Sequence, residues 1–190
     1  MNLLELLRPA DSAGSARIHG VVVGLVTNNH DPDGLGRVRL KFPWLGEADE
    51  GAWSRIASPM AGDKRGMFFL PEVNDEVLVC FEHADPRFPY VIGALWNGKD
   101  KPPLDNADGH NDVRLIRSRS GHLIRFTDKA GGELLEIIDS SGKNKISIDS
   151  AANKITLSSS GGTIRLEAGT TEISADAKVD VKGAVVNLNC

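Results

Sequence analysis

Residues 144–168, NKISIDSAANKITLSSSGGTIRLEA, decide the fold of this chain. Apolar residues stand there in pairs with one residue between them, and Ser, Asn, Gly, Ala and Lys fill the intervals. Side chains at positions i and i+2 share one face of a strand, so each pair predicts a short strand with one buried face, followed by a tight turn. The pairs continue almost to the last residue: Ile146/Ile148, Ile155/Leu157, Ile164/Leu166, Ile173/Ala175, Val179/Val181 and Val186/Leu188. A repeat this short is typical of a β-solenoid or β-helix.

These predicted strands need partners from outside the chain. Residues 146–190 contain no aromatic side chain, so each strand offers only two or three apolar groups. Ordering the backbone costs about 1–2 kcal/mol per residue, more than such small side chains return in a single copy. Three identical chains could instead form a prism with its axis lined by Ile146, Ile148, Ile155, Leu157, Ile164, Leu166, Val179, Val181, Val186 and Leu188. A single-chain solenoid is the alternative.

The first half of the chain predicts a different structure. Short apolar runs alternate with turn signals rich in Gly, Pro and Asp, which is typical of a small antiparallel sheet closed into a barrel. All three Trp and five of the six Phe lie in this region, where we expect them to form a core. The runs are His19–Thr27, Arg37–Pro43, Ala52–Ser58, Gly66–Leu70, Glu76–Glu82 and Tyr90–Trp96. The polar stretch 98–109, with two prolines, predicts a linker to the repeats.

Composition excludes several classes of function. The chain has 190 residues and a formal net charge of −4, without the basic excess of a duplex-binding protein. No apolar run is long enough to cross a bilayer, and the leucines near the N-terminus lack the basic region of a signal peptide. We expect a short amphipathic helix or docking arm there. Cys80 and Cys190 form no disulfide framework, so synthesis in the cytoplasm is expected.

Candidate chemical motifs are weak. Gly93–Asp100 approaches a phosphate-binding loop but ends in Asp where Ser or Thr would hold magnesium. Asp31–Gly34 lacks the remaining ligands of a calcium loop and predicts a turn. The five histidines have no ligand spacing, and His122 is interpreted as structural. Three Cys190 thiolates meeting on an axis would suit zinc or iron, but a free thiol is preferred. No cofactor is expected.

Several ordered stretches resemble the baseplate assembly protein V family of contractile phages, which is related to the spike proteins of type VI secretion. They cover nearly all of the chain after residue 17, as an ordered set rather than as one decisive motif. Asn74 stands where the family usually has Gly, and Asn also tolerates the left-handed region. The matching stretches are 20–26, 31–44, 53–57, 66–79, 85–97, 120–128 and 139–143.

The resemblance implies an all-β protein with an OB-fold barrel followed by an intertwined triple-stranded β-helix, working as a homotrimer. We therefore expect an N-terminal arm at 1–17, the OB domain at 18–98, a linker at 99–112 and the needle at 113–190. Some relatives carry a lysozyme domain between barrel and needle, and only the short linker stands there in this chain. The implied function is a non-enzymatic central spike in the baseplate of a phage tail or phage-tail-like particle.

The resemblance also implies partners. The OB domain would sit on a trimeric tail hub, and a small conical tip protein of the PAAR type would dock on Asn187, Leu188, Asn189 and Cys190. The needle would meet the target cell envelope. Two alternatives stay open, a hydrolase and a nucleic-acid-binding OB protein with a β-solenoid tail. Residues 1–110 hold 11 Lys and Arg against 16 Asp and Glu, which disfavours the nucleic-acid alternative.

Overall fold

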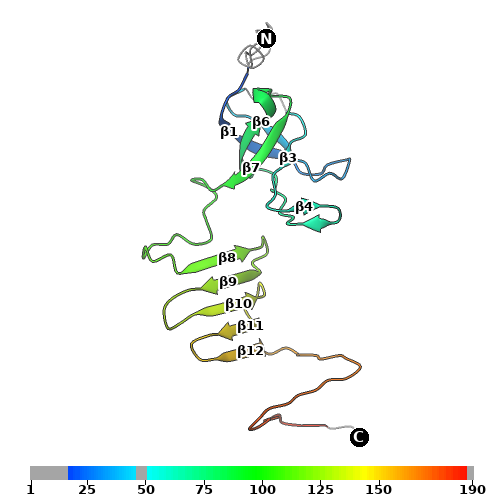
Figure 1. Ribbon diagram of the computed structural model, residues 1–190, viewed down its shortest axis with the longest axis vertical. Coiled ribbons are helices and arrows are strands. Elements are labelled where there is room, and N and C mark those ends of the chain that lie inside the picture. The colour runs from blue at the N-terminus through cyan, green and yellow to red at the C-terminus, as the bar shows by residue number, and fades with distance from the viewer. Residues whose placement is uncertain (1–16, 46–50, 188–190) are drawn as a thin grey trace, which may run out of the picture. The chain divides into compact units, whose positions relative to one another are not determined.

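The computed structural model describes residues 17–45 and 51–187, and their regular structure is almost entirely β. The single helical element among them is the 3-10 turn η1 at Glu82–Ala84. The chain divides between Pro102 and Pro103 into two compact units, each with its own sheet (Figure 1). The all-β prediction is confirmed. Most of the expected N-terminal arm and the last three residues, including Cys190, lie outside the described residues.

The first unit is a small closed barrel. Its main sheet has the order β2-β1-β6-β7-β3, with β3 and β7 parallel and the other pairs antiparallel. Val38 and Ser54, which precede the two edge strands, exchange main-chain hydrogen bonds of 3.0 and 2.7 Å and close the sheet on itself. A five-stranded Greek-key barrel of this order is OB-like, as predicted. Its strands are β1 Val21–Asn28, β2 Arg39–Lys41, β3 Arg55–Ile56, β6 Glu76–Phe81 and β7 Pro89–Leu95.

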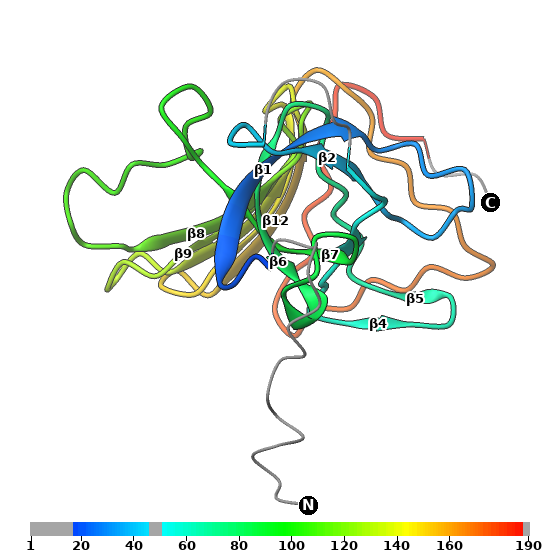
Figure 2. The same cartoon turned by 90° about the horizontal axis from the view of Figure 1, so that it is seen from above.

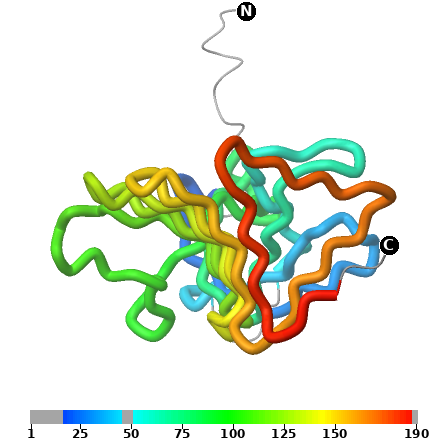
Figure 3. Tube along the Cα trace, turned by 90° about the horizontal axis from the view of Figure 1, so that it is seen from below, coloured from blue at the N-terminus to red at the C-terminus, as the bar shows by residue number. Residues whose placement is uncertain are grey.

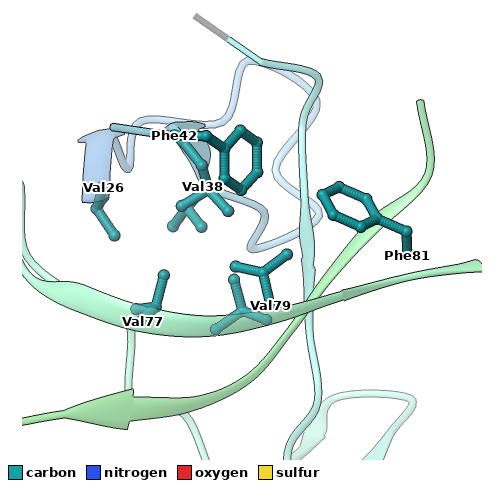
Figure 4. Close-up of a cluster of buried hydrophobic side chains, with 8 residues drawn as sticks. Val26, Val38, Phe42, Val77, Val79 and Phe81 are labelled. Atoms are coloured by element: carbon teal, nitrogen blue, oxygen red, sulfur yellow. The ribbon is translucent and has the colours of Figure 1, made fainter. Parts of the chain in front are cut away.

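The barrel interior is filled by alternate residues of the strands. Val77, Val79 and Phe81 point inward from β6, and Phe42 packs against Phe81 with the ring centroids 5.6 Å apart (Figure 4). Gly24 of β1 makes room for this packing, because a Cβ there would lie 3.3 Å from both Phe42 and Val79. Alternation along the strands therefore builds the core from the apolar runs of the sequence. The buried cluster consists of Val26, Val38, Leu40, Phe42, Val77, Val79, Phe81 and Val91.

The turns of the barrel are built by the expected residues. The Gly34 N–H donates to the Asp31 carbonyl at 3.1 Å, and both carboxylate oxygens of Asp31 accept hydrogen bonds from the Arg37 guanidinium. The hydrogen bonds from Arg37 hold the pKa of Asp31 below its ordinary value, so the ionised carboxylate stabilises the turn. Asn74 has a φ of 78° in a turn closed by the Asp75 N–H and the Glu72 carbonyl, which confirms the left-handed conformation expected there.

Two expectations for this unit are wrong. The run Gly66–Leu70 is not a strand; the chain forms a small hairpin just before it, β4 (Ala61–Gly62) with β5 (Arg65–Gly66), where only a turn was expected. The aromatic residues are also not all core. Phe68 and Phe69 are 77% and 63% exposed, and Trp96 is 67% exposed. Apolar composition predicted burial, but no element in the described part of the chain covers these side chains.

The second unit is one antiparallel meander. Its strands lie in chain order and each pairs with the next (Figures 1 and 3). Pairing within the chain differs from the expected single strands laid against other copies, because the tight turns bring consecutive strands into register. The chain carries no strand from Ser160 to Asn187, although apolar pairs predicted strands there. The strands are β8 Val113–Arg117, β9 Leu123–Thr127, β10 Leu134–Ile138, β11 Asn144–Asp149 and β12 Lys154–Ser159.

Truncation of Leu40 to alanine tests the barrel core. Leu40 is fully buried, so the change removes packed volume and should lower the free energy of unfolding by about 2–5 kcal/mol. Leu35, which is 69% exposed, is the matched control. Leu35→Ala should change the free energy of unfolding by no more than about 0.5 kcal/mol. Urea unfolding followed by tryptophan fluorescence measures both. Equal losses for the two variants would contradict the core described above.

Candidate functional site

The second unit presents a continuous apolar face. Cross-strand register places Ile146 opposite both Ile137 and Leu157, and Ile148 opposite both Leu135 and Ile155. The same face extends to β9 and β8 through further register pairs. We call the whole set the apolar ladder: Ile116, Ile124, Phe126, Leu135, Ile137, Ile146, Ile148, Ile155 and Leu157.

The apolar ladder is exposed although a sheet of this kind normally buries its apolar face. Ile155 is 75% exposed, Leu157 52% and Ile137 49%. On the opposite face Glu136 and Ser147 are 3% and 7% exposed. The opposite face is the more buried one, and it holds these polar side chains together with the half-buried Leu115, Leu123, Leu134 and Ile138. Single soluble chains rarely leave a contiguous apolar surface of this extent uncovered, and such surfaces mark interaction sites.

The structure places the predicted axis residues in two groups. Ile146, Ile148, Ile155 and Leu157 share the apolar ladder. The others that lie within the described range, Ile164, Leu166, Val179, Val181 and Val186, lie in the segment without strands, and all are about half exposed or more. Leu188 lies outside the described residues. The predicted axis residues did not include the members of the ladder in β8, β9 and β10, although the same alternation marks Ile124/Phe126 and Leu135/Ile137 in the sequence.

The opposite face is held by a charged triad. Glu136 of β10 lies between Arg125 of β9 and Lys145 of β11. The Arg125 Nε donates to Glu136 Oε2 at 2.9 Å, and Lys145 Nζ lies 3.3 Å from Glu136 Oε1. Three neighbouring strands are therefore joined by one buried carboxylate. A carboxylate buried to this degree requires such partners, because an unpaired charge would be costly.

Two carboxylates of this unit have lowered pKa values. Burial by itself raises the pKa of Glu136, but the hydrogen bonds and charges of Arg125 and Lys145 outweigh burial and leave it below the ordinary value. At the β10–β11 turn, the Ser141 hydroxyl and the Asn144 N–H lower the pKa of Asp139 to about 2. Both groups stabilise the folded unit when they are ionised, so acid should weaken it.

The remaining sequence motifs bring no reactive groups together. Asn97 Oδ1 accepts the N–H groups of Lys99 and Asp100 at 2.8 and 2.7 Å, so the near phosphate-loop sequence forms a turn that no helix follows. His122 Nδ1 accepts the Ser140 N–H at 3.2 Å and ties two turns of the meander together. In residues 17–45 and 51–187, no group of three or more His, Cys, Asp or Glu could hold a metal ion. The same residues include no helix with the length and apolarity needed to cross a membrane.

Substitution of Glu136 tests the triad. Glu136→Gln keeps the shape but leaves Arg125 and Lys145 without a carboxylate, and it should cost about 1–2 kcal/mol of unfolding free energy at pH 7. Because the folded pKa of Glu136 is lowered, its contribution is complete above the ordinary pKa of 4.5 and fades as the pH falls below it. The difference in unfolding free energy between Glu136→Gln and the unchanged chain should therefore be smaller at about pH 3 than at pH 7. Glu172→Gln, at an exposed position, is the control. Urea unfolding at both pH values measures this, and a pH-independent loss would contradict the role of the charge.

Residues 22–96, which form most of the barrel, match the family of the type VI secretion system/phage-baseplate injector OB domain. The chain is also similar to several curated spike proteins. It is 37% identical to the type VI secretion system spike protein VgrG5 of Pseudomonas aeruginosa over 45% of this chain and 11% of that protein. It is 28% identical to the spike protein VgrG1c of the same species over 70% of this chain and 20% of that protein.

A further relative carries a different name. The actin cross-linking toxin VgrG1 of Vibrio cholerae is 28% identical over 53% of this chain and 10% of that protein. The aligned segments thus span a fifth or less of the length of these relatives. The closed five-stranded barrel and the family match nevertheless agree with each other and with the stretches identified in the sequence. The chain carries the injector OB domain shared by type VI secretion systems and phage baseplates, and its predicted relationship to the baseplate spike family is confirmed.

Proposed function

We propose that this chain is a structural central spike of a contractile injection apparatus and works as a homotrimer. The single observation that carries the proposal is the exposed apolar ladder on a unit that follows an injector OB domain. Three copies that turn their ladders toward a common axis bury these side chains and leave the triad face of each sheet outward. Closed cyclic symmetry is the ordinary way in which identical chains cover such a face.

The segment after β12 supports an intertwined continuation. In residues 161–187 the main chain makes no hydrogen bond within the described part of the chain. Main-chain groups normally pair when a segment folds, and the apolar pairs of this segment are exposed as well. Strands from two other copies would supply main-chain hydrogen-bond partners and apolar contacts. The needle would therefore begin as three meanders and continue as a triple-stranded β-helix.

The two ends of the trimer would have different neighbours. The barrel end would sit on a trimeric hub at the end of the tail tube, and residues 187–190 would receive a small conical tip protein. Contraction would drive the needle against the target envelope. Main-chain hydrogen bonds within each meander, and between copies beyond it, would let the strands share the load. The assembled particle, rather than the free chain, is the expected working location.

We propose a mechanical role without catalysis for this chain. The relatives matched over the barrel include proteins whose names describe spikes, and the name of the toxin relative belongs to that longer protein alone. A nucleic-acid-binding barrel is not favoured, because acidic residues outnumber basic ones in the first 110 residues. The exposed aromatic side chains of the barrel fit contacts with another protein better than contacts with nucleic acid.

The oligomeric state tests the proposal. Light scattering should give a mass three times that of the 20.4 kDa chain. Ile155→Asp should abolish the trimer, because three carboxylates would be buried near the axis without partners. Thr156→Asp is the matched control on the opposite face of the same strand, and it should keep the trimer. A stable single chain at full length, or an Ile155→Asp trimer with an unchanged melting temperature, would contradict this arrangement.

A further inference from the structure

The barrel carries a second exposed apolar surface, which the trimer proposal does not use. The β4–β5 hairpin projects away from β1, β6 and β7 (Figures 1 and 2). Beside it lies a hollow of about 680 Å³ with walls formed by residues 34–36, 56–62 and 64–70. We call it the hairpin hollow. Five of its side chains are apolar and about half exposed or more: Leu35, Met60, Met67, Phe68 and Phe69.

The wall of the hairpin hollow is fixed before any partner arrives. The Met67 N–H donates to the Met60 carbonyl at 3.0 Å, and the Ser58 hydroxyl lies 2.7 Å from the Met67 carbonyl oxygen. Gly66 has a φ of 149°, and a Cβ there would lie 2.5 Å from the Met60 carbonyl oxygen. A larger residue at Gly66 would therefore disrupt the hairpin. A preformed wall lowers the cost of binding.

One edge of the hairpin hollow has open main-chain groups. Phe68, Phe69 and Leu70 follow β5 without belonging to a strand. Within the described residues their N–H groups donate no hydrogen bond and their carbonyl oxygens accept none. Leu70 packs against the barrel core and anchors this segment. An anchored segment with open main-chain groups can pair with an added strand from another polypeptide.

The charge at the hairpin hollow is positive. Lys64 and Arg65 belong to its lining, whereas Asp63 of the same turn does not. Neither cation has an ion-pair partner in the described part of the chain. Two uncompensated cations therefore border an apolar hollow on a chain whose net charge is −4. The complementary ligand is apolar and acidic.

We propose that the hairpin hollow binds an extended segment of another polypeptide that alternates apolar and acidic side chains. Its main chain pairs with residues 68–70, its apolar side chains pack against Phe68, Phe69 and the methionines, and its carboxylates meet Lys64 and Arg65. We assign the occupant to a different protein rather than to a second copy, because a symmetric contact between two hollows would bring their cations together. The proposal does not depend on the trimer.

The test uses the full chain and two synthetic peptides. The first is an acetylated and amidated seven-residue peptide in which Val alternates with Glu, and the second carries Lys in place of every Glu. The acidic peptide should bind at least about tenfold more tightly by calorimetry, and it should slow hydrogen exchange of the residue 68–70 amides. Equal affinity for the two peptides, or unchanged exchange at these amides, would overturn the proposal.

Variants separate the contributions of charge and of apolar contact to peptide binding. Lys64→Glu with Arg65→Glu should reverse the peptide preference, and Phe68→Ala with Phe69→Ala should weaken binding about tenfold. Trp96→Ala removes an equally exposed aromatic group outside the hollow and should leave binding unchanged. Both double variants should keep the mass of the unchanged chain by light scattering, since these side chains are exposed. Dissociation of the Phe68→Ala/Phe69→Ala variant would assign the surface to a contact between copies and would overturn the proposal for the hollow. Failure of Ile155→Asp to alter the mass would count only against the trimer.

Discussion

The pairing register of β9–β12 is the constraint on which the second unit depends. Once the meander is in register, every apolar side chain of the ladder falls on one face, and a slip of one residue would exchange the two faces. The buried Glu136 helps to prevent such a slip, because it finds Arg125 and Lys145 only in the observed register. The Glu136 triad therefore supports the register, and the register in turn creates an apolar face that the single chain does not cover.

The sequence was sufficient for features that depend on local chemistry. The left-handed turn at Asn74 and the Asp31 turn follow from residues that set backbone geometry by themselves. The barrel strands follow from short β-branched runs between these turns. The pairs Ile146/Ile148 and Ile155/Leu157 could each be assigned to one face of a strand from spacing alone. These predictions succeeded because the period of a strand is a property of the strand and needs no knowledge of its neighbours.

Features that depend on pairing could not be predicted in this way. The apolar run 66–70 resembles a strand in composition, but the hairpin before it takes the local pairing and leaves Phe68 and Phe69 exposed. The Glu136 triad joins residues that are 11 and 9 positions apart, and only the register brings them into contact. In the same way, the pairs from Ile164 onward have the spacing of strands, yet a strand requires a partner, and the described chain offers none after Ser159.

The two exposed apolar surfaces differ in what they can bind. The apolar ladder carries matching side chains on successive strands, so copies related by an axis present the same face to one another and can bury it together. The hairpin hollow has a cationic border at Lys64 and Arg65, and two copies meeting there would bring like charges together.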